Sequence, residues 1–205
     1  GKGQYTVFLT ADHAVAHVAG FMKENKLPGG TVDEEGGMKV VNKKLKELFG
    51  VDSLILSTYN YQLTLNQLAI KNNNLDRKKI TSWIIEYYAK LDGIARVFEL
   101  EELMATPLNS TIKDRIANGY FPKRSGDIQL VYLPGYMDGK YTGTTHGLWN
   151  PYDSHIPLLW YGWGVKKGNS HREVYMTDIA ATVAALLKIQ MPSGCVGKVI
   201  EEVIK

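Results

Sequence analysis

The sequence predicts an α/β fold. Short apolar runs rich in β-branched and aromatic residues, such as Tyr5–Leu9, alternate along the chain with longer stretches whose apolar residues recur at helical spacing. The chain has 205 residues, of which 44% are hydrophobic. That length and composition are enough to bury a substantial core, so we expect residues 1–205 to form one domain.

Composition and charge argue against several classes of protein. The 24 basic and 21 acidic residues leave a net charge of +3 that is dispersed along the chain, so we expect no nucleic-acid partner. No apolar run approaches the ~20 residues that span a bilayer, and no membrane span is expected. The single cysteine, Cys195, excludes an intrachain disulfide and is expected to be a passive thiol in a surface turn.

The first apolar run, Tyr5–Leu9, is predicted to be a buried strand, and it is followed closely by Asp12 and His13. In open α/β sheets, ligands bind beyond the carboxyl ends of the strands. A carboxylate and an imidazole at that position are both ligand types for zinc. The alternative is an Asp that caps a helix, followed by an incidental His.

The segment after His13 has helical character over 14–22 and is expected to end near Lys26, ahead of Pro28. On a helix, His13 and His17 would lie on one face. Without the Glu of the zincin pattern this spacing is a weak zinc signal. His17 is therefore a candidate for a metal or supporting role, and a surface histidine is the alternative.

The middle of the chain, about 30–120, is predicted to be a smaller α+β subdomain. Amphipathic spacing and caps predict a helix over 38–49 that stops at Gly50, and a second helix that starts at Asp76 and runs to about 91. Two short strands around Tyr59-Asn60 form a plausible hairpin. These two strands are 54–58 and 62–65, and the other expected elements are a strand over 95–98 and helical turns over 100–105 and 112–117.

Two polar clusters precede predicted strands in the last third of the chain. Arg124 stands before the strand 128–133, where it either holds a phosphate oxygen or pairs with a carboxylate. Asp153 and His155 stand before the strand 156–160. We expect these two to form a hydrogen-bonded pair that orients the preceding loop, in preference to direct ligation of a metal.

The final helix is predicted over 178–187. Thr177 is a suitable N-cap, and Asp178 in the first turn suits the helix dipole. The helix is apolar nearly all round, so we expect it to be buried against a sheet, with Ala180, Ala184 and Leu187 in the contact.

Two motifs, considered together, resemble those of the alkaline phosphatase superfamily. Thr10-Ala11-Asp12-His13 matches a T-x-D-H strand end, and Gly143-Thr144-Thr145-His146-Gly147 matches a G-T-x-H-G loop. The chain is most similar to the branch of the bacterial phosphate-irrepressible alkaline phosphatases and the related nucleotide pyrophosphatase/phosphodiesterases. Supporting matches lie at 118–120, 124–127 and 177–182, and the resemblance runs from about residue 4 to residue 203.

The resemblance implies a fold and a metal site. The fold is an alkaline-phosphatase-like α/β/α sandwich, of which this chain is the C-terminal portion, with 30–120 as an inserted α+β subdomain. In the family, residues of the Asp12 and His13 type bind one zinc ion and a residue of the His146 type binds the other. Two Zn²⁺ ions are therefore expected in the intact enzyme, with partial or no occupancy in this chain alone.

The resemblance also implies what the chain lacks. The family's Ser/Thr nucleophile and its remaining metal ligands precede the T-x-D-H strand, so no catalytic nucleophile is expected here and the missing N-terminal part is an expected partner. The intact protein is expected to be a periplasmic or secreted zinc-dependent phosphomonoesterase acting on small phosphate esters, and the fragment alone to be inactive. Two alternatives stay open: a phosphodiesterase or nucleotide pyrophosphatase of the superfamily, and a non-catalytic truncated binding module.

Overall fold

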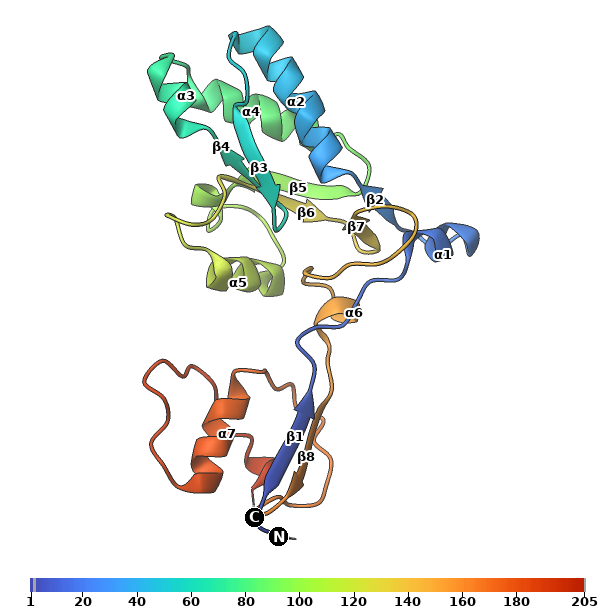
Figure 1. Ribbon diagram of the computed structural model, residues 1–205, viewed down its shortest axis with the longest axis vertical. Coiled ribbons are helices and arrows are strands. Elements are labelled where there is room, and N and C mark those ends of the chain that lie inside the picture. The colour runs from blue at the N-terminus through green and yellow to red at the C-terminus, as the bar shows by residue number, and fades with distance from the viewer. Residues whose placement is uncertain (2, 205) are drawn as a thin grey trace. The chain divides into compact units, whose positions relative to one another are not determined.

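The computed structural model describes residues 1 and 3–204 and contains a mixture of helices and strands (Figure 1). The chain divides into two compact units. One unit combines Gly1–Asp12 with Ile156–Lys205, and the other is the continuous segment His13–His155. The predicted subdomain range 30–120 lies inside the continuous unit.

An antiparallel sheet with the strand order β3-β4-β6-β5 forms the centre of the His13–His155 unit. Its strands are β3 (Ile55–Tyr59), β4 (Gln62–Leu65), β5 (Ile94–Glu99) and β6 (Ile128–Tyr132). Every residue of β6 is buried. Successive side chains of a strand point to opposite faces, so Leu130 joins the larger hydrophobic cluster and Val131 the smaller one.

Helices cover both faces of this sheet (Figure 1). The helices beside the larger cluster are α2 (Glu34–Phe49), α3 (Gln67–Asn72) and α4 (Arg77–Tyr88). Two of them confirm their predicted boundary signals. Asp76 caps α4 by accepting a hydrogen bond from Lys79 N at 3.2 Å, and α2 ends at Gly50, which has a positive φ of 74°. On the opposite face, α5 (Ser110–Gly119) packs Ile116 against the smaller cluster.

The remaining elements of this unit are short. They are α1 (Ala19–Glu24), β2 (Gly30–Val32), a 3-10 helix (Leu100–Glu102), β7 (Tyr136–Asp138) and α6 (Pro151–Ser154). Strands β2 and β7 pair in parallel. The long connection from β7 to α6 carries His146, so this region of the unit positions the candidate site.

The predicted helix over 14–22 is wrong in its first half, because only Ala19–Glu24 is helical. The backbone of 14–16 is instead bonded to distant segments. Ala14 N donates to the backbone oxygen of Asp153 at 2.9 Å, and Ala16 N donates to that of Thr145 at 3.2 Å. These tertiary hydrogen bonds replace the helical ones, so His13 and His17 do not share a helix face.

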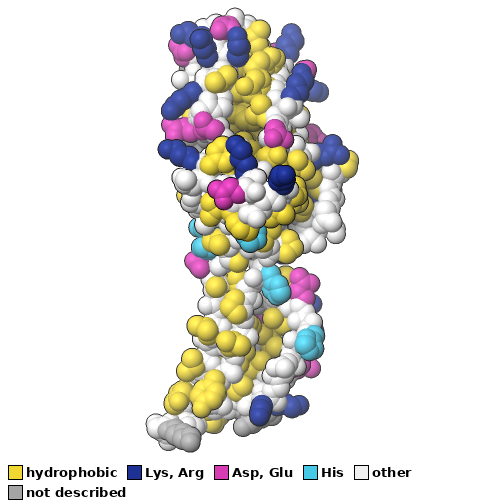
Figure 2. All heavy atoms as spheres, turned by 90° about the vertical axis from the view of Figure 1, so that its right-hand side faces the viewer, with side chains coloured by type: hydrophobic (Ala, Val, Ile, Leu, Met, Phe, Trp, Pro, Cys, Tyr) yellow, Lys and Arg dark blue, Asp and Glu magenta, His cyan; other side chains and the backbone are white. Residues whose placement is uncertain are grey.

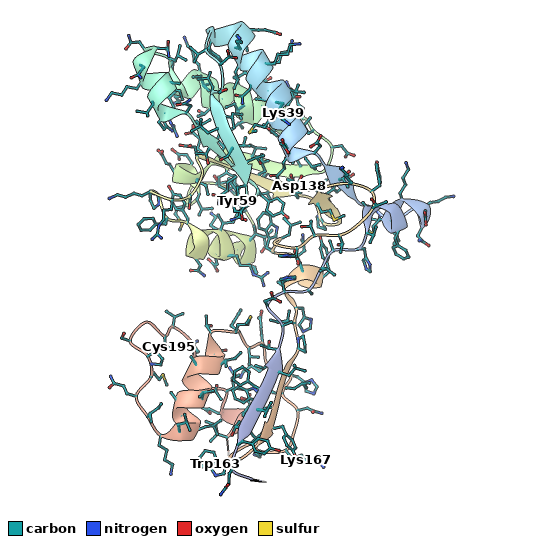
Figure 3. All side chains as sticks on the ribbon, viewed as in Figure 1. Lys39, Tyr59, Asp138, Trp163, Lys167 and Cys195 are labelled. Carbon is teal, nitrogen blue, oxygen red and sulfur yellow. The ribbon has the colours of Figure 1, made fainter. Side chains whose placement is uncertain are left out.

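In the other unit, β1 (Thr6–Thr10) pairs antiparallel with β8 (Leu158–Gly162). Helix α7 (Asp178–Leu187) and a 3-10 helix (Glu201–Val203) complete it. The predicted cap of α7 is replaced: Thr177 makes no capping side-chain bond among the described residues, whereas the Asp178 carboxylate accepts bonds from Tyr175 N and Lys198 N. Cys195 lies in the segment after α7, in a turn closed by its own N–H (Figure 3).

The expected burial of the first strand is not found within this chain. Val7 and Leu9 of β1 are 51% and 59% exposed, and Tyr161 of β8 is 65% exposed. The last helix is buried on one side only, because Ala184 is buried whereas Ala180 and Leu187 are exposed. Hydrophobic side chains therefore gather at the surface of the β1–β8 ribbon (Figure 2).

Over the part of the chain that the structure describes, every helix is too short or too polar to cross a lipid bilayer.

Candidate metal-binding site

Two histidines from distant parts of the sequence meet in the His13–His155 unit. The ring centroids of His13 and His146 are 3.5 Å apart, and the ring planes differ by 9°. His13 stands at the start of the unit, and His146 lies in the connection between β7 and α6. The structure thus brings together two of the three predicted metal ligands.

The ring of His13 contacts the backbone of the next residue. Its Nδ1 lies 2.7 Å from the carbonyl oxygen of Ala14, which accepts hydrogen bonds only. Nδ1 therefore carries the proton in this contact, and a neutral ring so held would present the lone pair of Nε2. A histidine that donates one N–H to a backbone carbonyl is the arrangement commonly found for metal-ligating imidazoles.

Asp153 connects the segments that carry the two histidines. Its backbone oxygen accepts the bond from Ala14 N, next to His13, and its Oδ2 accepts one from Leu148 N at 2.7 Å, two residues after His146. Asp153 as a whole residue is 3% exposed. Its other oxygen, Oδ1, is buried and has no hydrogen-bond partner among the described residues.

This arrangement differs in detail from the expected orientation of the loop by Asp153 and His155. The hydrogen bond of the Asp153 carboxylate goes to Leu148, whereas His155 is exposed at the end of α6. The Asp153 carboxylate therefore binds the backbone of the loop at Leu148. This hydrogen bond could be identified only from the tertiary structure.

Tyr61 also contacts the loop and was not identified from the sequence. Its hydroxyl donates to the backbone oxygen of His146 at 3.2 Å. Burial raises the pKa of this phenol above its ordinary value, and the nearby carboxylates of Glu34 and Asp153 raise it further. The hydroxyl is thus protonated and able to donate at neutral pH. The only signal in the sequence was its position beside the predicted hairpin turn at Tyr59-Asn60.

Asp12, His17 and Arg124 are also predicted site residues. Asp12 follows β1 and belongs to the other compact unit. His17 is exposed with its ring near that of Phe21, and the exposed guanidinium of Arg124 lies over the ring of Phe121, 4.8 Å from its centroid. Among the described residues, no ion pair of Arg124 with a carboxylate is formed.

The types of side chain at this site suit zinc. Neutral imidazoles and a carboxylate are typical zinc ligands, whereas magnesium and calcium prefer oxygen donors throughout. Among the described residues, no group of three or more His, Cys, Asp or Glu side chains is placed to hold a metal ion. Two imidazoles are fewer ligands than the three or four protein side chains that zinc usually has.

No protein-family model matches the chain. Three curated relatives match it over its whole length. Alkaline phosphatase PafA of Elizabethkingia meningoseptica is 45% identical, a protein of Myroides odoratus called calcium-transporting ATPase is 44% identical, and alkaline phosphatase PhoV of Synechococcus elongatus is 42% identical. The chain covers 37%, 38% and 37% of these proteins, respectively.

The fold gives the same result. The crystal structure of wild-type alkaline phosphatase PafA matches all of this chain with a TM-score of 0.94 and 44% sequence identity, and the match covers 39% of the PafA chain. The chain therefore belongs to the alkaline phosphatase superfamily and has the mixed α/β fold of the C-terminal part of such a protein. It spans little more than a third of the length of the relatives it matches.

Proposed function

We propose that this chain is part of a zinc-dependent phosphomonoesterase and supplies three of its metal ligands. The main support is the contact between His13 and His146, which come from two separate motifs of the phosphatase resemblance. Asp12 and His13 bind one zinc ion and His146 binds the other. The ions supply positive charge that stabilises the transferred phosphoryl group and its leaving oxygen.

The residues of this chain hold those ligands in place. The Ala14 carbonyl contacts Nδ1 of His13 and orients its ring, while Asp153 ties the backbone beside both histidines. Catalytic zinc usually has three protein ligands, so the other ligands and the Ser/Thr nucleophile come from outside these residues. The chain acts as one part of a larger active site.

The exposed apolar surface of the β1–β8 ribbon supports the proposal that this chain is part of a larger protein. Its hydrophobic side chains lie at the surface, where apolar groups of an isolated protein rarely form large patches (Figure 2). More than half of each curated relative lies outside the matched region. We propose that the corresponding part of the parent protein covers this ribbon, and that the parent acts in the periplasm or outside the cell.

The test compares the whole protein with this 205-residue chain, using p-nitrophenyl phosphate, its diester analogue and ATP. We expect the whole protein to hydrolyse the monoester fastest, to lose activity with a chelator and to regain it with zinc. His146→Ala should lower activity about 100-fold or more. The matched control is His171→Ala, which alters an exposed histidine of the other unit and should retain activity.

Three other results of this comparison would each contradict one part of the proposed function. Faster turnover of the diester or of ATP would replace the phosphomonoesterase by a phosphodiesterase or a nucleotide hydrolase. Zinc-dependent turnover by the 205-residue chain alone would show that the complete site lies within these residues. Full activity of the His146→Ala variant would exclude this residue as a ligand.

A further inference from the structure

We infer that Tyr61 is a positioning residue for His146. This inference rests on the proposed function, in which His146 binds a metal. Tyr61 lies in the turn of the β3–β4 hairpin, two residues after Tyr59, which ends β3 and is labelled in Figure 3. The Tyr61 hydroxyl donates to the backbone oxygen of His146 at 3.2 Å. The hairpin thereby reaches from the central sheet to the residue that carries the imidazole.

The backbone of Tyr61 has an unusual conformation for an aromatic residue. Tyr59 pairs with Gln62, so Asn60 and Tyr61 form the two-residue turn, and both have positive φ angles, of 52° and 61°. Such turns strongly favour Asn followed by Gly, because a side chain at positive φ crowds the backbone. A tyrosine at this position costs conformational free energy, and such strained residues are often found where the side chain has a role.

The core holds Tyr61 firmly. Its carbonyl oxygen accepts hydrogen bonds from Leu130 N at 2.8 Å and from Gln129 Nε2 at 2.9 Å. Its ring meets that of Tyr132 edge-on, with the centroids 5.0 Å apart, and the Tyr132 hydroxyl donates to buried Glu34 at 2.6 Å. The side chain is thus held by the central sheet, and the sheet determines where its hydroxyl lies.

The ring of Tyr61 also lies near the residue after His146. Gly147 has a φ of +105°, and a Cβ added there would lie 3.7 Å from Tyr61 Cε2. The loop therefore contacts the Tyr61 hydroxyl at His146, and a side chain at Gly147 would meet the ring. Other anchors hold the loop at Thr145 and Leu148, whereas Tyr61 binds the peptide of the proposed ligand itself.

The test is Tyr61→Phe in the whole protein that carries this chain, which removes the hydroxyl and keeps the ring. The matched control is Tyr88→Phe, because the Tyr88 hydroxyl is buried in the same hydrophobic cluster and has no hydrogen-bond partner among the described residues. We expect Tyr61→Phe to weaken zinc binding about tenfold in chelator competition. Amide hydrogen exchange over 145–148 should become about tenfold faster in the metal-free protein. Tyr88→Phe should change neither.

The two measurements separate this inference from the proposed function. A parent protein that binds no zinc overturns the proposed function, and the exchange comparison then still judges the role of Tyr61. Unchanged exchange over 145–148 in Tyr61→Phe overturns the inference, as does unchanged zinc affinity in a zinc-binding parent. If exchange accelerates equally in 145–148 and in α4, the hydroxyl only contributes to global stability and the positioning role is rejected.

Discussion

The carboxylate of Asp153 provides a direct test of how the loop with His146 is held. Leu148 N donates to Asp153 Oδ2 at 2.7 Å, and both residues are buried. The change Asp153→Ala removes the acceptor and leaves the Leu148 N–H without this partner. We expect the protein to become less stable and the loop to open more often.

Two opposing contributions determine the size of the effect. A hydrogen bond to a charged group stabilises a fold by about 1.5–3 kcal/mol. Asp153 Oδ1 is buried without a partner among the described residues, so removal of the carboxylate also relieves part of a desolvation cost. We expect Asp153→Ala to lower the free energy of unfolding by about 1–2 kcal/mol. Asp153→Asn keeps an acceptor oxygen, and its effect should stay below about 1 kcal/mol.

Residue-resolved hydrogen exchange is the appropriate assay. A loss of 1–2 kcal/mol corresponds to opening that is about 5–30 times more frequent, so the Leu148 amide should exchange faster by that factor. The amide of Ala14 is the internal control, because it donates to the backbone oxygen of Asp153, which the substitution retains. Equal acceleration at both amides, or at neither, would refute the assigned role of the carboxylate.

Three further predictions concern the two compact units. Burial raises the pKa of Glu34 above its ordinary value despite hydrogen bonds from Thr58 and Tyr132, so the folded state favours its acid form. The free energy of unfolding of the unchanged protein, relative to that of Glu34→Gln, should therefore be highest below pH ~4.5 and fall as the pH rises through the raised pKa. Denaturant titrations at several pH values measure this difference, and the opposite trend would show that burial does not raise the pKa of Glu34. Ala184→Asp buries an unpaired charge in α7 and should lower the free energy of unfolding by about 3 kcal/mol or more, whereas Ala180→Asp on the exposed side should change it by no more than about 0.5 kcal/mol. Equal melting temperatures of the two variants would contradict the one-sided burial of the helix. Leu130→Ala should cost about 2–5 kcal/mol in chemical unfolding and Leu56→Ala far less, because Leu130 is fully buried in β6 and Leu56 is 55% exposed in β3; similar losses would place the core elsewhere.

Local signals predicted most elements of the fold. Asp76 starts α4 and Gly50 ends α2 because capping oxygens and positive φ angles act within one turn of the helix. The β3–β4 hairpin and the strand β6 also lie where apolar patterning predicted them. The T-x-D-H and G-T-x-H-G motifs also identified two residues of the candidate site, His13 and His146. The rings of these two histidines are in contact in the structure.

The sequence by itself therefore determined the type and approximate position of most elements, and it selected the two histidines that meet. Only the tertiary structure decided the non-helical path of 14–18, the contact of Asp153 with Leu148, and the role of Tyr61. It also decided the exposure of β1, which depends on what else packs against that strand. The physical reason is range: periodicity and caps act among residues a few positions apart, whereas these contacts join segments that approach each other only once the chain has folded.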